Sequence, residues 1–223
     1  MDEKLFCQAI TKFISGLVMV GVLIFLPAGS FMYWQGWLLI GILFVPMFIA
    51  GLIMMKKSPE LLRKRLNVKE EETEQKTVIM LSGIMFLAAF VVAGLNFRFG
   101  WIVLPEWVSY AGAIIFLAAY ALYAEVLREN AYLSRTVEVQ QDQKVIDTGL
   151  YGVVRHPMYM STLLLFLAMP LVLGSIISFV ITLAYVPIIA KRIGNEEKVL
   201  EDGLPGYAEY KNKVKRKVVP FIW

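Results

Sequence analysis

Long apolar tracts with almost no charged residues alternate with short polar segments over the first 127 residues of the chain. A helix needs about 20 apolar residues to cross a hydrocarbon core of about 30 Å. The pattern therefore predicts four membrane-spanning helices. They are expected at Phe13–Leu26, Trp37–Met55, Val78–Leu95 and Val108–Leu127, the last interrupted only by Glu125.

A fifth apolar tract, Met158–Ala190, carries no charge and is too long for a single upright helix. Gly174 and Ser175 lie near its middle, where small residues favour a reversal of the chain. Pro170 and Pro187 would bend either arm. We therefore expect a helical hairpin over this tract.

The composition agrees with a membrane protein, because 58% of the residues are hydrophobic, against roughly 45–50% in soluble domains. Together these patterns predict an all-α fold, a polytopic transmembrane helical bundle with about six crossings. No small-residue cleavage site follows the first apolar run, so it is expected to stay in the membrane as a span. Cys7 is the sole cysteine, which excludes an intrachain disulfide, a zinc cluster and a thiol pair.

Six crossings would put both termini on the same side of the membrane. Of the 22 Lys and Arg residues, Arg98 alone falls in a loop on the opposite side, so the positive-inside rule makes the side of the termini cytoplasmic. An outer aromatic belt is also expected, from Tyr33, Trp34, Trp37, Trp101, Trp107 and Tyr110. The excess of basic over acidic residues, a net charge of +4, favours anionic lipid headgroups as partners rather than nucleic acid.

Polar residues that could do chemistry gather at both ends of the predicted hairpin. His156, the only histidine, follows Arg155 and precedes Pro157 at the first end. At the other end, Arg192 and Glu196 are four residues apart and share a helix face. Alternatively, Arg155 and His156 could anchor a helix end at the membrane surface, and Arg192 and Glu196 could form a surface ion pair. Because a hairpin returns to its starting side, however, we expect the two groups to converge at one bilayer depth.

At these positions the sequence resembles the isoprenylcysteine carboxyl methyltransferase family, which is related to the membrane phospholipid methyltransferases. The resemblance rests on an ordered set of motifs from about Glu125 to the end of the chain. These are Gly149-Leu150-Tyr151, Arg155-His156-Pro157-Met158-Tyr159, Arg192 with Glu196-Glu197 and Leu200, and Tyr207 with Tyr210 before a basic stretch. Gly203-Leu204-Pro205-Gly206 departs from the family's usual Phe-Gly. The resemblance divides the chain into an N-terminal membrane region, 1–127, and a C-terminal cofactor-binding region, 128–223.

The resemblance implies S-adenosylmethionine as the cofactor and a lipophilic small molecule or lipid as the methyl acceptor. The residues that match the family's cofactor contacts are Gln140, Gln143, Lys144, Val145, Ile146, Tyr151, His156, Pro157, Met158, Tyr159 and Glu196. Arg192 matches the residue assigned to the acceptor. A carboxylate acceptor would need no base, whereas an amine would need one, for which Glu197 and His156 are the candidates.

Three other functions remain open from the sequence. One is a phospholipid amine N-methyltransferase that uses the same cofactor. Another is a membrane reductase of the sterol type, which would bind NADPH between late helices. The last is a lipid-binding or sensing protein without catalytic activity.

Overall fold

The computed structural model describes residues 3–66, 73–133 and 139–223, and the regular elements in these ranges are helices. They are α1 (Glu3–Ala28), α2 (Trp34–Lys57), α3 (Pro59–Leu66), α4 (Thr73–Phe99), α5 (Glu106–Glu129), η1 (Gly149–Gly152), α6 (Pro157–Val172), α7 (Ile176–Thr182), α8 (Tyr185–Gly203) and α9 (Tyr207–Lys213). Five segments are long and apolar enough to cross a membrane: α1, α2, most of α4, α5, and α7 with α8. The helix α6 is a shorter apolar helix. The predicted fold class is confirmed, and the chain is an integral membrane protein.

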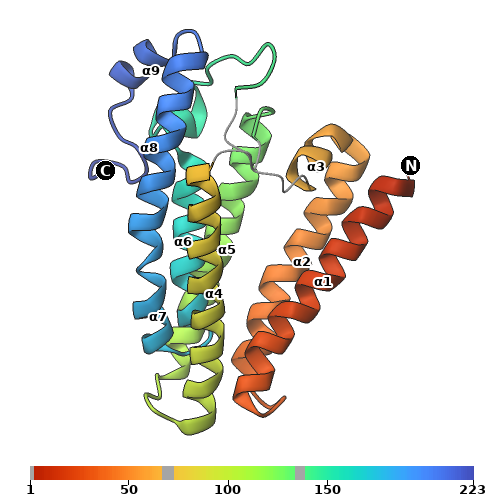
Figure 1. The fold of residues 1–223 in the computed structure, drawn as a ribbon. Helices are drawn as coiled ribbons and strands as arrows, with labels where there is room; N and C mark the ends of the chain where they lie inside the picture. The colour runs from red at the N-terminus through yellow and green to blue at the C-terminus, as the bar shows by residue number, and fades with distance from the viewer. Residues whose placement is uncertain (1–2, 67–72, 134–138) are drawn as a thin grey trace.

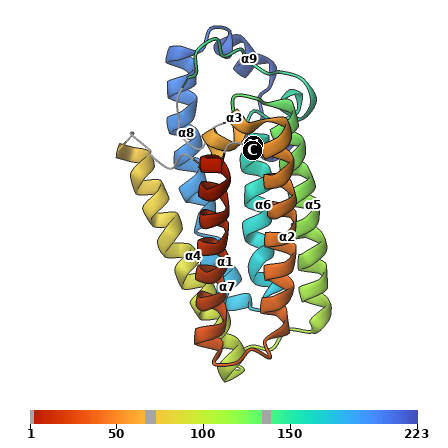
Figure 2. The same cartoon turned by 90° about the vertical axis from the view of Figure 1, so that its right-hand side faces the viewer.

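The helices run along one long axis, so their connections gather at two opposite ends (Figure 1). The short helices α3 and α9 lie toward one end, as do the two ends of the chain. The turns from α1 to α2, from α4 to α5 and from α6 to α7 lie at the other end, and the perpendicular view agrees (Figure 2). This is the arrangement that six crossings predict.

The predicted hairpin is present and reverses at Gly174 and Ser175, as expected. Gly174 has a φ of 66°, and the Ser175 side chain caps α7 by accepting a hydrogen bond from the Ser178 amide. The bend in the returning arm differs from the prediction, because α7 ends at Thr182 and α8 begins at Tyr185. Pro187 lies in the first turn of α8, where its missing N–H costs no helical hydrogen bond.

Glycines allow close contacts between two pairs of helices, α5 with α6 and α4 with α1. A Cβ added to Gly112 of α5 would lie 2.8 Å from the Val172 amide nitrogen of α6. A Cβ added to Gly94 of α4 would lie 2.7 Å from the Ile24 carbonyl oxygen of α1. Small residues at such contacts allow helices in a membrane to approach closely. The first arm of the hairpin is thereby held against α5, which brings the residues before α6 close to the end of α5.

The polar segment between α2 and α4 is partly helical. Pro59 begins α3 at the first helical position, where proline is favoured. The Arg65 guanidinium of α3 lies 5.4 Å from the ring centre of Tyr123 on α5. Residues 67–72 of this segment lie outside the described residues.

Candidate active site

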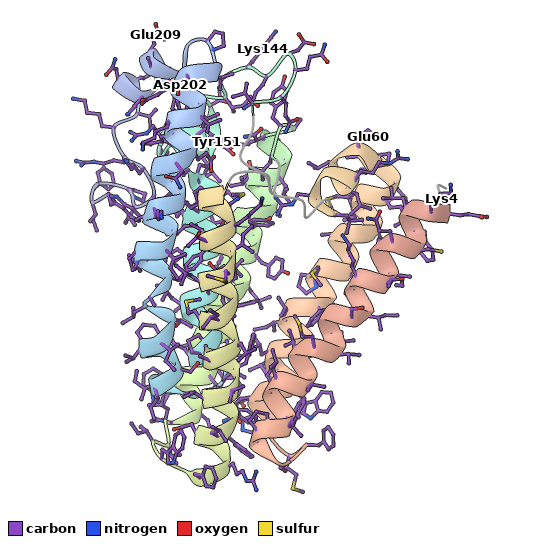
Figure 3. The ribbon with its side chains drawn as sticks, viewed as in Figure 1. Lys4, Glu60, Lys144, Tyr151, Asp202 and Glu209 are labelled. Carbon is purple, nitrogen blue, oxygen red and sulfur yellow. The ribbon has the colours of Figure 1, made fainter. Side chains whose placement is uncertain are left out.

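A pocket opens where α5, η1, α6, α8 and α9 meet, at the end of the bundle that holds both chain ends. Its volume is about 850 Å³, including space open to solvent. Tyr151 lies near the ends of the helices, whereas Lys144 and Glu209 lie farther out along the bundle axis (Figure 3). The pocket therefore lies between the apolar helices and the polar segments beyond them.

The short helix η1 begins at a glycine with a left-handed backbone conformation. Gly149 has a φ of 51°, and a Cβ there would lie 1.4 Å from a Glu129 carboxylate oxygen. That carboxylate accepts a hydrogen bond from the Leu150 amide at 3.1 Å. The end of α5 is thus tied to η1, which sets the position of Tyr151.

Tyr151 is buried in the pocket wall and held from two sides. Its hydroxyl accepts a hydrogen bond from the Asn130 side chain at 2.9 Å, and its carbonyl accepts one from the Tyr210 hydroxyl at 2.8 Å. Burial raises the pKa of the Tyr151 hydroxyl far above its ordinary value, so the group is neutral at physiological pH. The ring therefore offers a neutral aromatic surface to a ligand.

The backbone of Arg155 and His156 is held by the segment after α9. The Arg155 amide donates to the Arg216 carbonyl at 2.9 Å, and the His156 amide donates to the Lys217 carbonyl at 2.8 Å. Pro157 then begins α6. Two residues that precede the hairpin are therefore fixed by hydrogen bonds to residues that follow α8 and α9.

A buried cluster of charged residues surrounds Glu197, which is 4% exposed. Its Oε1 accepts hydrogen bonds from Arg155 at 2.8 Å and lies 3.2 Å from His156 Nε2. Its Oε2 lies 2.9 Å from the Lys217 ammonium. Arg155 also donates to the Val214 carbonyl at 2.7 Å. Glu197 therefore joins the start of α6, the middle of α8 and the segment after α9.

The neighbouring Glu196 faces the pocket and is part of a second polar group. The Tyr159 hydroxyl donates to Glu196, and it accepts a hydrogen bond from Arg192 Nε at 3.0 Å. His156 Nδ1 lies 3.8 Å from Glu196 Oε1. The Glu196 side chain is 24% exposed, against 5% for Glu197, so it remains accessible to a ligand. A carboxylate and a guanidinium thus lie side by side on the pocket wall, linked by a phenol.

Residues 111–202 match the model of the isoprenylcysteine carboxyl methyltransferase (ICMT) family. This match supports the resemblance to the ICMT family that the sequence motifs indicate. The matched part runs from α5 to the end of α8 and includes η1, the His156 motif and both glutamates. No curated protein matches the chain. The match agrees with the resemblance on which the site prediction was based, and the ICMT family consists of membrane methyltransferases.

Most of the residues that the ICMT resemblance assigned to the cofactor or acceptor line the pocket. These are Gln143, Lys144, Val145, Ile146, Tyr151, His156, Met158, Tyr159, Arg192 and Glu196. Gln140, Pro157 and Glu197 are not among the lining residues. The Gln140 side chain instead donates a hydrogen bond to the Tyr132 carbonyl at 2.5 Å. The Gln140 backbone amide donates to the side-chain oxygen of Gln143, so Gln140 orders the loop.

The pocket also has lining residues that the ICMT resemblance did not assign to it. These are Asn130, Tyr132, Leu133, Arg155, Val199, Leu200, Leu204, Tyr207 and Tyr210. Helix periodicity could have found Val199 and Leu200, which lie three and four residues after Glu196 on the same face. Tyr207 and Tyr210 were part of the tail motif, but nothing in the sequence pointed their side chains toward the pocket.

Tyr207 has a feature that points to a ligand. The residue is 4% exposed, and its hydroxyl is buried without a hydrogen-bond partner in the described part of the chain. Burial raises the pKa of this hydroxyl far above its ordinary value, which keeps it protonated. Buried polar groups almost always have a partner, so a hydroxyl left over in a pocket is a candidate contact for a bound molecule.

Proposed function

We propose that this ICMT-family protein transfers a methyl group from S-adenosylmethionine to a lipophilic carboxylate at the cytoplasmic face of the membrane. The observation that carries the proposal is the pair formed by Glu196 and Arg192, bridged by the Tyr159 hydroxyl in the pocket wall. The Glu196 carboxylate suits a cationic ligand group, and the Arg192 guanidinium suits an anionic one. Residues 1–127 would form the N-terminal membrane region, and residues 128–223 would form the cofactor-binding region.

The residues of the pocket fit S-adenosylmethionine, which would supply a methyl group activated on a sulfonium. Glu196 would bind a positively charged part of the cofactor. Val145, Leu200 and Leu204 give the end of the pocket near α9 an apolar surface for a nucleoside. The buried hydroxyl of Tyr207 would gain its missing hydrogen bond there.

Arg192 would bind the acceptor carboxylate and orient it. A guanidinium can hold a carboxylate with two parallel hydrogen bonds, which fixes direction as well as position. A carboxylate is already ionised at neutral pH, so methyl transfer to it needs no base. Alignment would then supply most of the acceleration, since well-oriented reactants reach effective molarities of about 10⁵ M or more.

The surroundings of Glu197 favour a carboxylate over an amine as the acceptor. An amine must lose a proton, and Glu197 and His156 are the two predicted bases. Both oxygens of Glu197 are already bound by Arg155, His156 and Lys217, and its side chain is buried. The His156 ring lies between the two carboxylates of α8. Glu197 is therefore not free to take a proton from a substrate without breaking this cluster.

Methyl-deuterated S-adenosylmethionine added to membranes that contain the protein tests the proposal. The expected product is a lipid-soluble ester that carries the label, is found by mass spectrometry and is lost in mild alkali. Membranes with the Glu196→Gln variant should give much less of this product. An alkali-stable label on a phospholipid amine would overturn the carboxylate acceptor, and no labelled lipid at all would overturn the proposed transfer.

A further inference from the structure

The last residues described, Val219–Trp223, form a tight turn that presents apolar side chains outward. The amides of Val218 and Val219 both donate to the Trp223 carbonyl at 2.8 Å, and the Trp223 amide donates back to the Val219 carbonyl at 3.0 Å. Phe221 and Ile222, at the tip of this turn, are 89% and 79% exposed. The turn is therefore a defined structure with an apolar tip.

The backbone at the tip of this turn is strained. Phe221 has a φ of 66°, in the left-handed region that is unfavourable for a large side chain. Trp223, by contrast, packs against an apolar cluster that includes Tyr159 and Ile193. One aromatic residue thus anchors the turn to the bundle while another points away from the protein.

The turn lies at the end of the bundle where α1 begins and α2 ends (Figure 1). The end of the chain lies at about the level of α3 and of the start of α1, whereas α9 lies farther out (Figure 1). Glu209 on α9 is likewise farther out than Lys4 and Glu60 (Figure 3). Lys215 and Arg216, which precede the turn, are exposed. Apolar residues at such a level, preceded by basic ones, are complementary to hydrocarbon beneath anionic headgroups.

We infer that the Val219–Trp223 turn inserts Phe221 and Ile222 into the membrane leaflet on the side of the pocket, with Lys215 and Arg216 on anionic headgroups. Lipid contact would anchor the segment whose carbonyls, at Arg216 and Lys217, hold the backbone of Arg155 and His156. The leaflet would therefore help to fix the position of the site. This inference rests on the arrangement of the helices in the membrane and not on the proposed methyl transfer.

A fluorescent label at the tip tests the insertion. In a Cys7→Ser background, Phe221→Cys would be labelled with an environment-sensitive dye and the protein placed in lipid nanodiscs. Glu209→Cys on α9 is the matched control, and Ile222→Cys is a second probe of the same turn. We expect blue-shifted emission at 221 and 222 that nitroxide-bearing lipids quench and aqueous iodide does not, with the reverse at 209. Iodide quenching at 221 and 222 equal to that at 209 would overturn the insertion.

The headgroup contact has its own test. Nanodiscs of phosphatidylcholine alone would be compared with nanodiscs that also contain phosphatidylglycerol. We expect stronger nitroxide quenching at 221 with the anionic lipid, and no such increase in a Lys215→Gln, Arg216→Gln variant. Equal nitroxide quenching in both lipids would show that Lys215 and Arg216 do not bind anionic headgroups. Since no substrate is added, these results do not depend on whether the protein transfers methyl groups.

Discussion

Arg155 and Glu197 are 42 residues apart in the sequence and form a buried ion pair at 2.8 Å. Their side chains are 4% and 5% exposed. With Lys217, this pair connects α6, α8 and the segment after α9. The pair therefore holds together the elements that form the pocket.

Removing one partner of this pair should strongly destabilise the protein. Glu197→Ala leaves the Arg155 guanidinium buried without its carboxylate, which typically costs about 3–5 kcal/mol. Thermal unfolding in detergent should show a clearly lower Tm for Glu197→Ala, and the Arg155→Ala, Glu197→Ala double variant should lose less than the sum of the two single variants. Asp147→Ala, which removes an exposed ion pair with Lys213, is the control and should leave Tm nearly unchanged. A Glu197→Ala variant as stable as this control would contradict the structural role.

Two tyrosines on α9 should respond to loss of the hydroxyl in opposite ways. Tyr207→Phe removes a buried hydroxyl without a partner, so the Tm of the free protein should be unchanged or higher. Tyr210→Phe removes a hydrogen bond to the Tyr151 carbonyl, so Tm should fall. Tyr207→Phe should instead bind S-adenosylmethionine about two- to tenfold more weakly, the value of one hydrogen bond. Equal affinity for wild type and Tyr207→Phe would show that this hydroxyl does not contact the ligand.

Arg192→Lys should separate acceptor binding from cofactor binding. Lysine keeps the positive charge but loses the planar fork that orients a carboxylate. We expect kcat/KM for the acceptor to fall about 10- to 100-fold, while the Kd for S-adenosylmethionine stays within about twofold of wild type. Lys191→Gln, a change to the exposed neighbour on α8, should alter neither quantity. An equal loss of cofactor affinity in Arg192→Lys would place this side chain on the cofactor instead.

The orientation in the membrane can be measured with the single native cysteine. Cys7 is exposed near the start of α1, and Met32 is 87% exposed at the opposite end of the bundle. A membrane-impermeant maleimide should label Cys7 in inside-out vesicles and not in right-side-out vesicles. In a Cys7→Ser, Met32→Cys variant the pattern should be reversed. Labelling of Cys7 in right-side-out vesicles would contradict the positive-inside assignment of the termini.

The sequence predicted the large features of the fold because membrane helices follow simple rules of length and charge. The long apolar tracts became helices, and Gly174 and Ser175 became the turn of the hairpin. The return of the hairpin brought His156 close to Glu196, as expected. These predictions needed only the thickness of a bilayer and the rule that a hairpin ends where it began.

The division of roles between Glu196 and Glu197 could not be predicted in the same way. Adjacent residues on a helix point about 100° apart, and the sequence does not say which direction faces the pocket. That choice depends on Arg155 and Lys217, which approach Glu197 from other elements. The burial of the Tyr207 hydroxyl without a partner in the described part of the chain could not be predicted either, because it depends on how α9 packs beside the pocket.

Binding of S-adenosylmethionine to purified protein, measured by calorimetry in detergent or nanodiscs, tests the central claim most directly. Wild type should bind S-adenosylmethionine and not NADPH. Glu196→Gln should bind S-adenosylmethionine at least about tenfold more weakly, since it loses a charge-assisted contact. Glu201→Gln, a change to an exposed carboxylate on the same helix, should bind like wild type. NADPH binding without S-adenosylmethionine binding, or equal affinity in wild type and Glu196→Gln, would contradict the account.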